Sequence, residues 1–571
     1  MHKQLKTQHP NEKTIRQICN LTGLHRVTAT VLANRGITSQ SQLSAFLNPS
    51  LNHLRSFEKL IDMDKAVCRI TDAIINQEKI LVFGDYDVDG ITSVTILYEF
   101  LTLTGANVSY YIPHRVNEGY SLKIQHISDV AIAGNINLIV TTDCGSASHE
   151  AVKCANQSGI DVIVTDHHTI SSTMPDAFAI VNPRRNDCPS GAGYLAGVGV
   201  VFYLLISLRK HLRDINFWND KQEPNLKNFS DLVALGTISD IVPLVNENRI
   251  ITKAGLDVIN TSPRTGIKAL IDACGINKPF IDAEDIAFKL APRLNAAGRM
   301  DHAMLAVELL STKDASQARD IAEKLNLLNS NRQLVENKIL QFILMYFNQE
   351  PQNLNKKTIV FGNHGWHAGV LGIVASKLVD KFFRPVVLIS IKDGIGKGSA
   401  RSIPGINLYD ALDACSEFLE NFGGHPMAGG IEIKGENIKP FAAKFEKTVR
   451  EMSTPDNFLP EMLIDCELEF DMISDQLINE LESLHPFGHK NPEPVFLSNN
   501  VVVAFSKIIG NDHLRLSLKQ RHSNSNKIIP GIWFNAGKEA QDKKYFNTMA
   551  YTLKWNYWNG NKTLQAVIKD A

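Results

Sequence analysis

The stretch from Lys79 to Ser93, KILVFGDYDVDGITS, constrains the fold of this chain more than any other segment. Its residues Ile80 to Phe83 form a β-branched and aromatic run, a glycine marks a turn, and apolar residues then recur at helical spacing. This pattern predicts a strand, a loop and a helix. Three alternating aspartates, Asp85, Asp87 and Asp89, lie on the loop. Because open parallel sheets bind their ligands at the carboxyl ends of strands, we expect a functional site at this loop.

Two other interpretations of these aspartates stay open at this point. The pattern D-x-D-x-D-G matches the first six positions of a calcium-binding loop, but its twelfth position, which should be Glu, is Ile96. The aspartates of an ordinary turn can also cap the following helix. Three carboxylates in alternation need more than capping, however, because like charges this close repel one another unless a cation binds them.

Two further strand-like runs between residues 79 and 244 also end in ionisable residues. The runs ILVF, VSYYI, NLIVTT, DVIVT and FAIV alternate with amphipathic segments, which predicts a parallel sheet with crossover helices. Asp143 follows NLIVTT, and Asp166, His167 and His168 follow DVIVT. If these strands neighbour the first one, their carboxyl ends bring the ionisable side chains together.

The side chains expected to meet are typical of a divalent-metal site. They are Asp87, Asp89, Asp143 and His167, with Asp240 in the stretch DLVALGTISDIVPL as a further candidate. Carboxylates suit magnesium or manganese, and the imidazole favours manganese. Two such ions about 3.5 to 4 Å apart would activate a water and stabilise the leaving oxygen in phosphoester hydrolysis. The chain contains no nucleophile elbow, Walker loop or dinucleotide glycine fingerprint, so the residues alone predict metal-assisted hydrolysis.

Composition places the chain among multidomain globular proteins. Its 571 residues exceed a single core and predict about three or four domains. Because the net charge is only -1, nucleic-acid binding would have to come from local patches. The eight cysteines form no C-x-x-C pair, which indicates reduced thiols. The N-terminus lacks the apolar core of a signal peptide and no apolar run is long enough to span a bilayer, so we expect a cytoplasmic protein.

A long helix and a second α/β unit are predicted after the sheet. The periodic apolar pattern over residues 314–349 contains neither Gly nor Pro. A helix of that length spans roughly 50 Å and can connect two lobes, with an internal core helix as the alternative. The smaller α/β unit begins at Thr358, and its glycine-rich loops contain Ser399, Arg401 and His425. Such loops can bind a phosphate, although ordinary glycine turns are common.

The last segment, from about Leu459, alternates in strand fashion and predicts a small OB-like β-barrel. Residues 501–571 contain 11 Lys or Arg against 4 Asp or Glu. Aromatic residues interleave with these bases, a combination that suits a single nucleic-acid strand because every base can stack. Half of the aromatics are expected to belong to the core instead. The aromatic set is Trp533, Phe534, Tyr551, Trp555, Tyr557 and Trp558.

An ordered set of motifs resembles a known family over most of the chain. DYDVDG, TTDCG, DHH and ALGTISDIVPL, which begin at residues 85, 141, 166 and 234, look like the four phosphoesterase motifs of the DHH superfamily. IPHR, APRLNAAGRM, WHAGVLGIVASK, GGH and PFGHKNPEP, which begin at residues 112, 291, 366, 423 and 486, narrow the resemblance to the RecJ family of single-strand-specific DNA exonucleases. The resemblance implies an α/β protein with a parallel-sheet DHH phosphoesterase domain, a long connecting helix, a second smaller α/β domain and a C-terminal OB-like barrel.

The resemblance also implies roles for individual residues. The metal ligands for two Mn²⁺ or Mg²⁺ ions would be Asp87, Asp89, Asp143, His167 and Asp240, with Asp143 bridging. Asp85 and Asp166 would be ligands or would orient ligands, and His168 would contact the scissile phosphate or assist the leaving group. The residues expected to hold the 5′ phosphate or nearby backbone are Arg115, Arg293, Arg299, Ser399, Arg401 and His425.

The implied activity is a 5′-to-3′ exonuclease that releases 5′ mononucleotides from single-stranded DNA in repair and recombination, and its polarity rests on the resemblance alone. We expect a monomer, with a single-strand-binding protein and a helicase as partners. Two alternatives remain. Another DHH phosphoesterase, such as an oligonucleotide hydrolase or a pyrophosphatase, would not need the long helix and basic terminal module. A catalytically dead binding protein would not need the complete ligand set.

The expected domain boundaries follow the motifs. They are an N-terminal helical accessory region (1–75), the DHH catalytic domain (76–265), a helical connector (266–355), the DHH-associated domain (356–455) and the OB-like nucleic-acid-binding domain (456–571). Two residues depart from the family pattern, since Gly429 stands where Ala is expected and Lys490 where Gly is expected. Both affect the expected geometry of loops rather than the metal site.

Overall fold

The computed structural model describes residues 3–56, 59–170, 173–510, 512–521, 527–558 and 561–571. The chain divides into two compact units. One contains Thr7–Asn326 and Ile464–Ala571, and the other contains Met1–Lys6 and Leu327–Leu463. None of the helices within the described ranges is long and apolar enough to cross a membrane.

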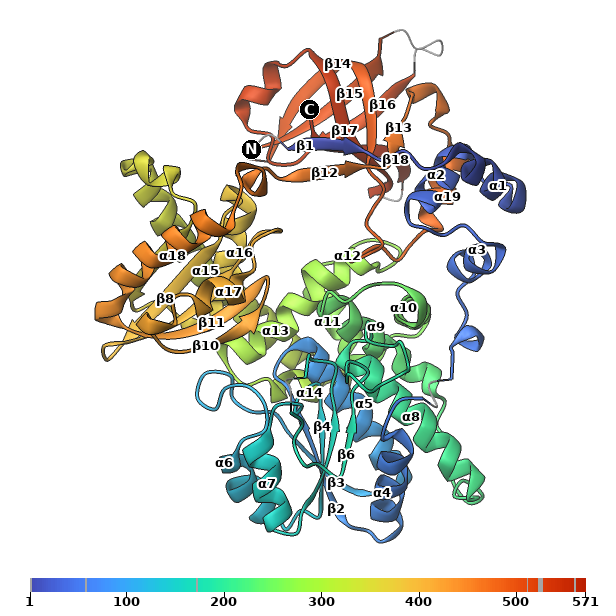
Figure 1. The fold of residues 1–571 in the computed structure, drawn as a ribbon. Helices are drawn as coiled ribbons and strands as arrows, with labels where there is room; N and C mark the ends of the chain where they lie inside the picture. The colour runs from blue at the N-terminus through green and yellow to red at the C-terminus, as the bar shows by residue number, and fades with distance from the viewer. Residues whose placement is uncertain (1–2, 57–58, 171–172, 511, 522–526, 559–560) are drawn as a thin grey trace. The chain divides into compact units, whose positions relative to one another are not determined.

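A five-stranded parallel sheet leads into the alternating aspartates, as predicted (Figure 1). Asp85 and Asp87 lie on the loop after the strand Lys79–Gly84, but the prediction was wrong for Asp89, which lies in the first turn of the following helix. Every residue of the central strand β4 is buried, which is typical of a parallel sheet covered on both faces. The five predicted strands are all present. In spatial order they are β3 (Asn107–Tyr111), β2 (Lys79–Gly84), β4 (Leu138–Thr142), β5 (Asp161–Thr165) and β6 (Ala179–Val181).

Helices cover both faces of this sheet. On one face, α7 (His149–Gln157) and the π-helical segment η2 (Ile127–Ile132) share a core with Leu81 and Phe83 of β2. On the other face lie α4 (Met63–Ile75), α5 (Val88–Thr104) and α8 (Gly197–Asp214) (Figure 1). Because further helices pack against α5, it is buried on nearly all sides. The remaining helices of this region are α9 (Ser230–Ser239), α10 (Asn246–Thr261), α11 (Thr265–Ala273), α12 (Ala283–Asp285), α13 (Ala291–Met300) and α14 (Met304–Ser311).

The N-terminal helices share a hydrophobic core with the C-terminal barrel. Ile15, Ile18 and Val27 belong to the same buried cluster as Leu477 and Leu481. The helices involved are α1 (Glu12–Thr22), α2 (Arg26–Asn34), α3 (Gln40–Leu47) and α19 (Asp475–Glu482). The backbone N–H of His25 donates to Glu480, which lies 455 residues further along the chain. A strand that the sequence pattern did not predict, β1 (Gln4–Thr7), pairs with β12 (Glu461–Ile464).

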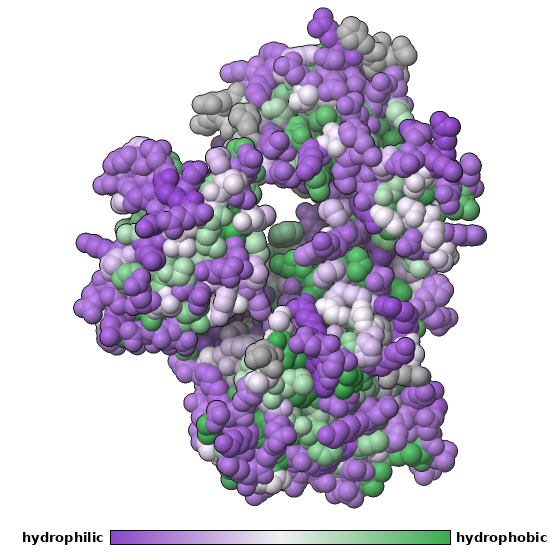
Figure 2. All heavy atoms as spheres, in the orientation of Figure 1, coloured by the Kyte–Doolittle hydropathy of each residue, from purple (hydrophilic) through white to green (hydrophobic). Residues whose placement is uncertain are grey.

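The C-terminal strands form the predicted OB-like barrel. It is closed because β14 pairs with both β15 and β17, and the short β13 (Cys466–Glu467) extends the sheet beside β14. Hydrophilic residues dominate the visible face of the barrel (Figure 2). Its strands are β14 (Phe496–Ile509), β15 (His513–Gln520), β16 (Ile528–Trp533), β17 (Tyr545–Trp558) and β18 (Asn561–Asp570).

The barrel aromatics divide between core and surface. Tyr551 is fully buried, and Trp533 and Trp555 are partly buried against the same core. Phe534 is 48% exposed, and the ring of Tyr557 packs edge-on against Phe280. The side chain of Trp558 and the polar stretch 522–526 lie outside the described residues. Of the two interpretations, base stacking by all of these aromatics or core packing by about half of them, the second therefore describes the barrel better.

The second compact unit is a smaller α/β fold, as predicted. Its five-stranded sheet has the order β10-β11-β9-β8-β7, in which only β7 and β8 are parallel. The strands are β7 (Ile359–His364), β8 (Val386–Lys392), β9 (Ile395–Arg401), β10 (Leu419–His425) and β11 (Ala428–Lys434). Its helices are α16 (Ala368–Phe382), α17 (Leu408–Asp413) and α18 (Ile438–Met452). The predicted long helix is α15 (Ala315–Gln349), and the division between the two units falls within it.

The two departures from the family pattern have different structural consequences. Lys490 has φ of +61°, the left-handed region that glycine adopts without strain. A Cβ atom at Gly429 would lie 3.1 Å from both the Gly423 carbonyl oxygen and Leu412 Cδ1. Both distances are shorter than ordinary contacts by a few tenths of an ångström, and the end of the Leu412 side chain can move by that much. Glycine is therefore the less strained residue at 490, while alanine at 429 needs only a small adjustment.

We expect Lys490→Gly to raise the midpoint of thermal unfolding by about one or two degrees. A left-handed residue with a Cβ costs roughly 1–2 kcal/mol, and glycine removes this cost. The greater conformational entropy of glycine in the unfolded chain offsets part of the gain in stability. Calorimetry of the full chain measures the shift. Lys490→Val should lower the midpoint, and Lys507→Gly, near the C-terminal end of β14, should lower it as well. Equal destabilisation by glycine at both positions would show that residue 490 is not strained.

Candidate functional site

The carboxyl ends of three adjacent strands meet at one edge of the parallel sheet. β2 leads into Asp85, β4 into Asp143 and β5 into Asp166 and His167. Because β2 pairs with β4 and β4 pairs with β5, these residues follow neighbouring strand ends. Asp240 joins them from the C-terminal end of α9.

Three overlapping sets of side chains have the geometry of metal ligands. Within each set, the candidate ligand atoms lie within 4.8 Å of one another. Asp143 and His167 each belong to two sets, so they connect all three. The sets are Asp89 with His167 and Asp240, Asp85 with Asp87 and Asp143, and Asp143 with His167 and His168.

The tautomer of His167 follows from its contact with a backbone carbonyl. Its Nδ1 lies 3.1 Å from the Leu195 carbonyl oxygen, which can only accept, so Nδ1 carries the proton. Burial, followed by the charge of His168, lowers the pKa of His167 to about 3. The ring is therefore neutral, and its Nε2 presents a lone pair to the carboxylates. This Nε2 lies 3.1 Å from Asp143, 3.6 Å from Asp240 and 3.8 Å from Asp89.

Three buried atoms of this cluster have no hydrogen-bond partner among the described residues. They are His167 Nε2, Asp143 Oδ1 and Asp85 Oδ1. A lone pair 3.1 Å from a carboxylate oxygen is repulsive unless a cation lies between them. Adjacent ligands of an octahedral ion with bonds near 2.1 Å are about 3 Å apart, which matches this separation. The donor set, one imidazole nitrogen and several carboxylate oxygens, therefore fits manganese or magnesium.

Burial and mutual repulsion disfavour the charged forms of the carboxylates. Burial raises the pKa of Asp89 to about 7, with the charge of Asp87 as the next cause. Burial, then Asp89 and Asp87, raises the pKa of Asp240 to about 9. Burial and neighbouring carboxylates also raise the pKa of Asp85 and Asp143 well above the usual range. A bound divalent cation would reverse these shifts, because it favours the charged form of each ligand.

The first turns of two helices hold individual carboxylates in place. Asp87 caps α5, accepting from the backbone N–H groups of Asp89 and Gly90, so this residue caps the helix and also belongs to a candidate ligand set. Asp89 accepts from the N–H groups of Gly197 and Val198 at the start of α8, at 2.6 and 2.8 Å. A helix N-terminus favours negative charge, so α8 stabilises the ionised Asp89.

Asp166 orients His168 rather than facing the other carboxylates. It accepts from the N–H groups of Ser146, His167 and His168, and its Oδ1 lies 2.8 Å from His168 Nδ1. Burial alone would raise the pKa of Asp166, but the hydrogen bond and charge of His168 bring it below the usual range. Burial alone would lower the pKa of His168, but the same hydrogen bond raises it to about 9. His168 is therefore cationic near neutral pH, with Nε2 free of this interaction.

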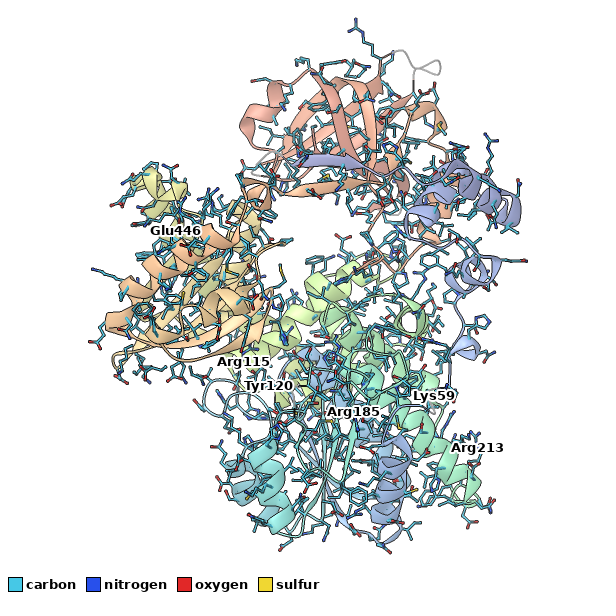
Figure 3. All side chains as sticks on the ribbon, viewed as in Figure 1. Lys59, Arg115, Tyr120, Arg185, Arg213 and Glu446 are labelled. Atoms are coloured by element: carbon cyan, nitrogen blue, oxygen red, sulfur yellow. The ribbon has the colours of Figure 1, made fainter. Side chains whose placement is uncertain are left out.

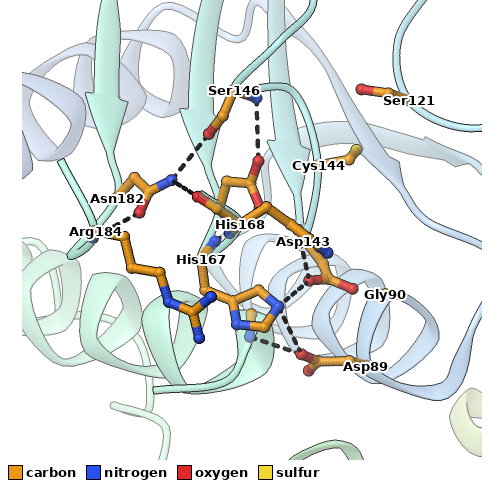
Figure 4. A network of polar contacts seen from close by, with 12 residues as sticks. Asp89, Gly90, Ser121, Asp143, Cys144, Ser146, His167, His168, Asn182 and Arg184 are labelled. Carbon is orange, nitrogen blue, oxygen red and sulfur yellow. Dashed lines mark hydrogen bonds and ion pairs between the residues drawn. The ribbon is translucent and has the colours of Figure 1, made fainter. Parts of the chain in front are cut away.

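Several residues of the site escaped the sequence analysis. Tyr120 places its hydroxyl 3.2 Å from His168 Nδ1 and 3.4 Å from the Asp143 carbonyl oxygen. Asn182, at the end of β6, donates to Ser146 Oγ and to the His168 carbonyl oxygen (Figure 4). Arg184 donates from Nε to the Gly193 carbonyl oxygen, and its guanidinium extends toward His167 (Figure 4). The strand-end rule would have found Asn182, whereas Tyr120 and Arg184 lie on loops without such a signal.

Two of the three predicted arginines in the first unit lie beside this cluster. Arg115 stacks over the ring of Tyr86, 4.6 Å from its centroid, and Tyr86 packs edge-on against Tyr120. Figure 3 labels Arg115 and Tyr120, which lie near one another. Arg299 follows Gly298, where a Cβ would lie 2.6 Å from the Tyr86 carbonyl oxygen, so α13 contacts the aspartate loop closely. Arg293 instead donates to the Asn326 side chain and the Lys289 carbonyl, and its bonds hold α13 to neighbouring helical segments.

The predicted residues of the second unit share one face of its sheet. Arg401, Ala428 and His425 are directly opposite one another on β9, β11 and β10. Ser399 is two residues before Arg401 and therefore points to the same face. The residues opposite Ser399 are Gly430 and then Gly423, which leaves open space beside the side chains of Arg401 and His425. The Arg401 guanidinium also lies against Gly372 of α16.

Family models match three parts of the chain. Residues 79–237 match the N-terminal domain of the DHH family, residues 355–451 match the DHHA1 domain, and residues 464–570 match the RecJ OB domain. These ranges contain the parallel sheet, the smaller α/β unit and the barrel, respectively.

Curated relatives and solved structures cover nearly the whole chain. It is 35% identical over 568 residues to the single-stranded-DNA-specific exonuclease RecJ of Bacillus subtilis, covering 99% of this chain and 70% of that protein. It is 34% identical to the RecJ of Escherichia coli, covering 94% of each. RecJ of Thermus thermophilus in complex with Mn²⁺ superposes with a TM-score of 0.83 at 28% identity, over 99% of this chain and 79% of that one. The same protein in complex with Mg²⁺ gives a TM-score of 0.75 at 27% identity, over 99% and 78%.

We expect Gly197→Ala to weaken Mn²⁺ binding by about ten- to a hundredfold. The added Cβ would lie 2.4 Å from Asp143 Oδ1 and would displace that carboxylate. Isothermal titration with Mn²⁺ measures the change. Gly199→Ala is the matched control, because its Cβ would make ordinary contacts of 3.4 Å or more in the same helix turn. Unchanged affinity in Gly197→Ala would exclude Asp143 as a ligand in this position.

Proposed function

We propose that this chain, which belongs to the RecJ family, is a metal-dependent exonuclease specific for single-stranded DNA. The observation that carries the proposal is the convergence of three strand ends on buried ligand atoms that lack partners among the described residues. The names of the relatives supply the substrate class. The finer features of the proposal are 5′-to-3′ polarity, release of 5′ mononucleotides and a role in DNA repair and recombination.

The proposed metal ligands divide into two groups joined by Asp143. Asp89, His167 and Asp240 would hold one cation, Asp85 and Asp87 would hold the other, and Asp143 would bridge them. When bound, such a pair of cations lowers the pKa of the attacking water and stabilises charge on the phosphate and on the leaving oxygen. The solved relatives with Mn²⁺ and Mg²⁺ support the choice of metal.

His168 and Asp166 are proposed to act as an acid and its orienting partner. Asp166 holds Nδ1 of His168, so that Nε2 is directed to the substrate side with a proton available. From there His168 can donate to a phosphate oxygen or to the leaving oxygen. Tyr120 packs edge-on against this ring at 5.7 Å and limits its rotation.

Phosphate recognition is proposed for both units separately. In the first unit, Arg115 and Arg299 lie beside the aspartate loop, and Arg184 extends toward His167, so all three are suited to contact phosphate oxygens near the reaction. In the second unit, Ser399, Arg401 and His425 share a glycine-lined face that suits a terminal phosphate. Arg293 is a weaker candidate for phosphate binding, because its hydrogen bonds go to neighbouring helices.

The barrel is proposed to bind the nucleic-acid strand beyond the reacting end. Its excess of basic residues and its exposed aromatic Phe534 suit a single strand. A single-strand-binding protein and a helicase remain the partners that we propose from the resemblance.

Digestion of an oligonucleotide labelled separately at each end tests the activity. We expect the 5′ label to leave first as a mononucleotide, only with Mn²⁺ or Mg²⁺ present and only from the single strand, because the site needs the cations for chemistry. A chelator and the matching duplex are the controls. Loss of the 3′ label first would keep the metal chemistry but contradict the polarity, and binding without digestion would indicate an inactive binding protein.

Asp143→Asn should reduce hydrolysis by at least about a thousandfold and leave single-strand binding largely unchanged. Asparagine tolerates the φ of +60° at this position, so the variant removes a charge without straining the backbone. Single-turnover digestion and fluorescence anisotropy measure the two properties. Asp187→Asn, which removes an exposed carboxylate paired with Arg185, is the control and should behave like the wild type. Near-normal turnover in Asp143→Asn would refute the metal assignment.

A further inference from the structure

Asp240 differs from Asp89 and His167, the other members of its candidate ligand set, in how it is held. Asp89 accepts from two backbone N–H groups, and His167 is fixed through Nδ1. Asp240 is 25% exposed at its side chain, and its carboxylate lies 3.6 Å from His167 Nε2. Among the described residues, none donates a hydrogen bond to this carboxylate. Its position therefore depends on the backbone of the turn that carries it.

That turn has an unusual conformation directly after Asp240. Ile241 has φ of +56°, a left-handed conformation that is rare for a β-branched residue. Its side chain is 71% exposed, so side-chain packing contributes little to holding this conformation. Strained backbone of this kind persists only where surrounding contacts determine it, and it occurs often at functional sites.

The surrounding contacts come from a loop in the C-terminal region, residues 486–491. The Nδ1–H of His489 donates to the Ile241 carbonyl oxygen at 3.0 Å. The backbone N–H of Leu244 donates to the His489 carbonyl oxygen at 2.8 Å. Gly488 lies so close that a Cβ there would be 2.7 Å from Leu244 Cδ1. One residue, His489, thus holds both ends of the turn that follows Asp240.

The 486–491 loop is itself anchored by buried polar groups. Asn491 is buried and donates to the carbonyl oxygens of Leu484 and Pro486. Arg249 on α10 is buried, donates to the same two carbonyl oxygens and to that of Phe46, and stacks on the Phe46 ring at 3.7 Å. Because Arg249 follows the Asp240 turn closely in the chain, the loop and the turn are fixed to one another at two points.

We infer that the 486–491 loop positions Asp240 for metal binding and that His489 is the positioning residue. The inference rests on the assignment of Asp240 as a ligand in the proposed function. Replacing a residue that holds a metal ligand in position typically changes metal affinity or activity by about ten- to a hundredfold. The metal centre would then include a component from the C-terminal region, 248 residues beyond Ile241 in the sequence.

Mn²⁺ titration of full-length variants, followed by calorimetry and by the electron paramagnetic resonance of bound Mn²⁺, tests this inference. We expect His489→Leu to weaken binding of one Mn²⁺ by about tenfold and to alter its spectrum. His489→Asn should restore both properties, because the asparagine side-chain nitrogen can replace Nδ1 as donor. The activity of His489→Leu should recover at saturating Mn²⁺.

Two further variants separate the possible failures. His25→Leu removes a histidine–backbone hydrogen bond far from Asp240, in which Nδ1 accepts from the Val27 N–H at the start of α2, and it should bind Mn²⁺ like the wild type. Asp240→Asn reports on the ligand itself. If Asp240→Asn weakens binding but His489→Leu does not, the positioning role is wrong and the proposed function stands. If neither variant weakens binding, the assignment of Asp240 is wrong and the inference falls with it. Equal loss in His489→Leu and His489→Asn would also overturn the role of the hydrogen bond.

Discussion

Burial of several carboxylates at one edge of a parallel sheet is the constraint on which the rest of the structure depends. Uncompensated buried charge is costly, and the protein places α8 with its N-terminus against Asp89. Glycines stand where the helices approach most closely, since a Cβ at Gly197 or Gly236 would collide with Asp143 or with Thr92 and Asp89. The remaining negative charge requires cations. The carboxylates at this sheet edge thus need more positive partners than the hydrogen-bond donors of the described residues supply.

Local sequence patterns predicted the parts of this arrangement that depend on nearest neighbours. The apolar runs before Asp85, Asp143 and Asp166 are continuous because both faces of their strands are buried, so their ends could be located from the sequence. Once the strands were placed in one parallel sheet, the meeting of the three ends followed from topology. The long helix was visible because 35 residues continue without a helix breaker.

The parts that the sequence did not predict depend on contacts between distant segments. The Leu195 carbonyl oxygen fixes the proton of His167 on Nδ1. Every residue has a backbone carbonyl, so no sequence motif could reveal this contact. Asp166 follows a strand like the ligands do, but backbone N–H groups and His168 surround it and direct it away from their set. Tyr551 and Phe534 lie in the same barrel, yet only the barrel closure decides that the first is buried and the second exposed.

The shared core of the N-terminal helices and the C-terminal region has a consequence for synthesis of the chain. The apolar faces of α1 and α2 pack against residues that are made much later, as the hydrogen bond across 455 residues from His25 to Glu480 illustrates. At about 5–20 residues per second, these faces wait on the order of 20 to 90 seconds on the ribosome before their partners emerge. The nascent segment that contains α1 and α2 is therefore a natural substrate for chaperones that bind exposed apolar helices during translation.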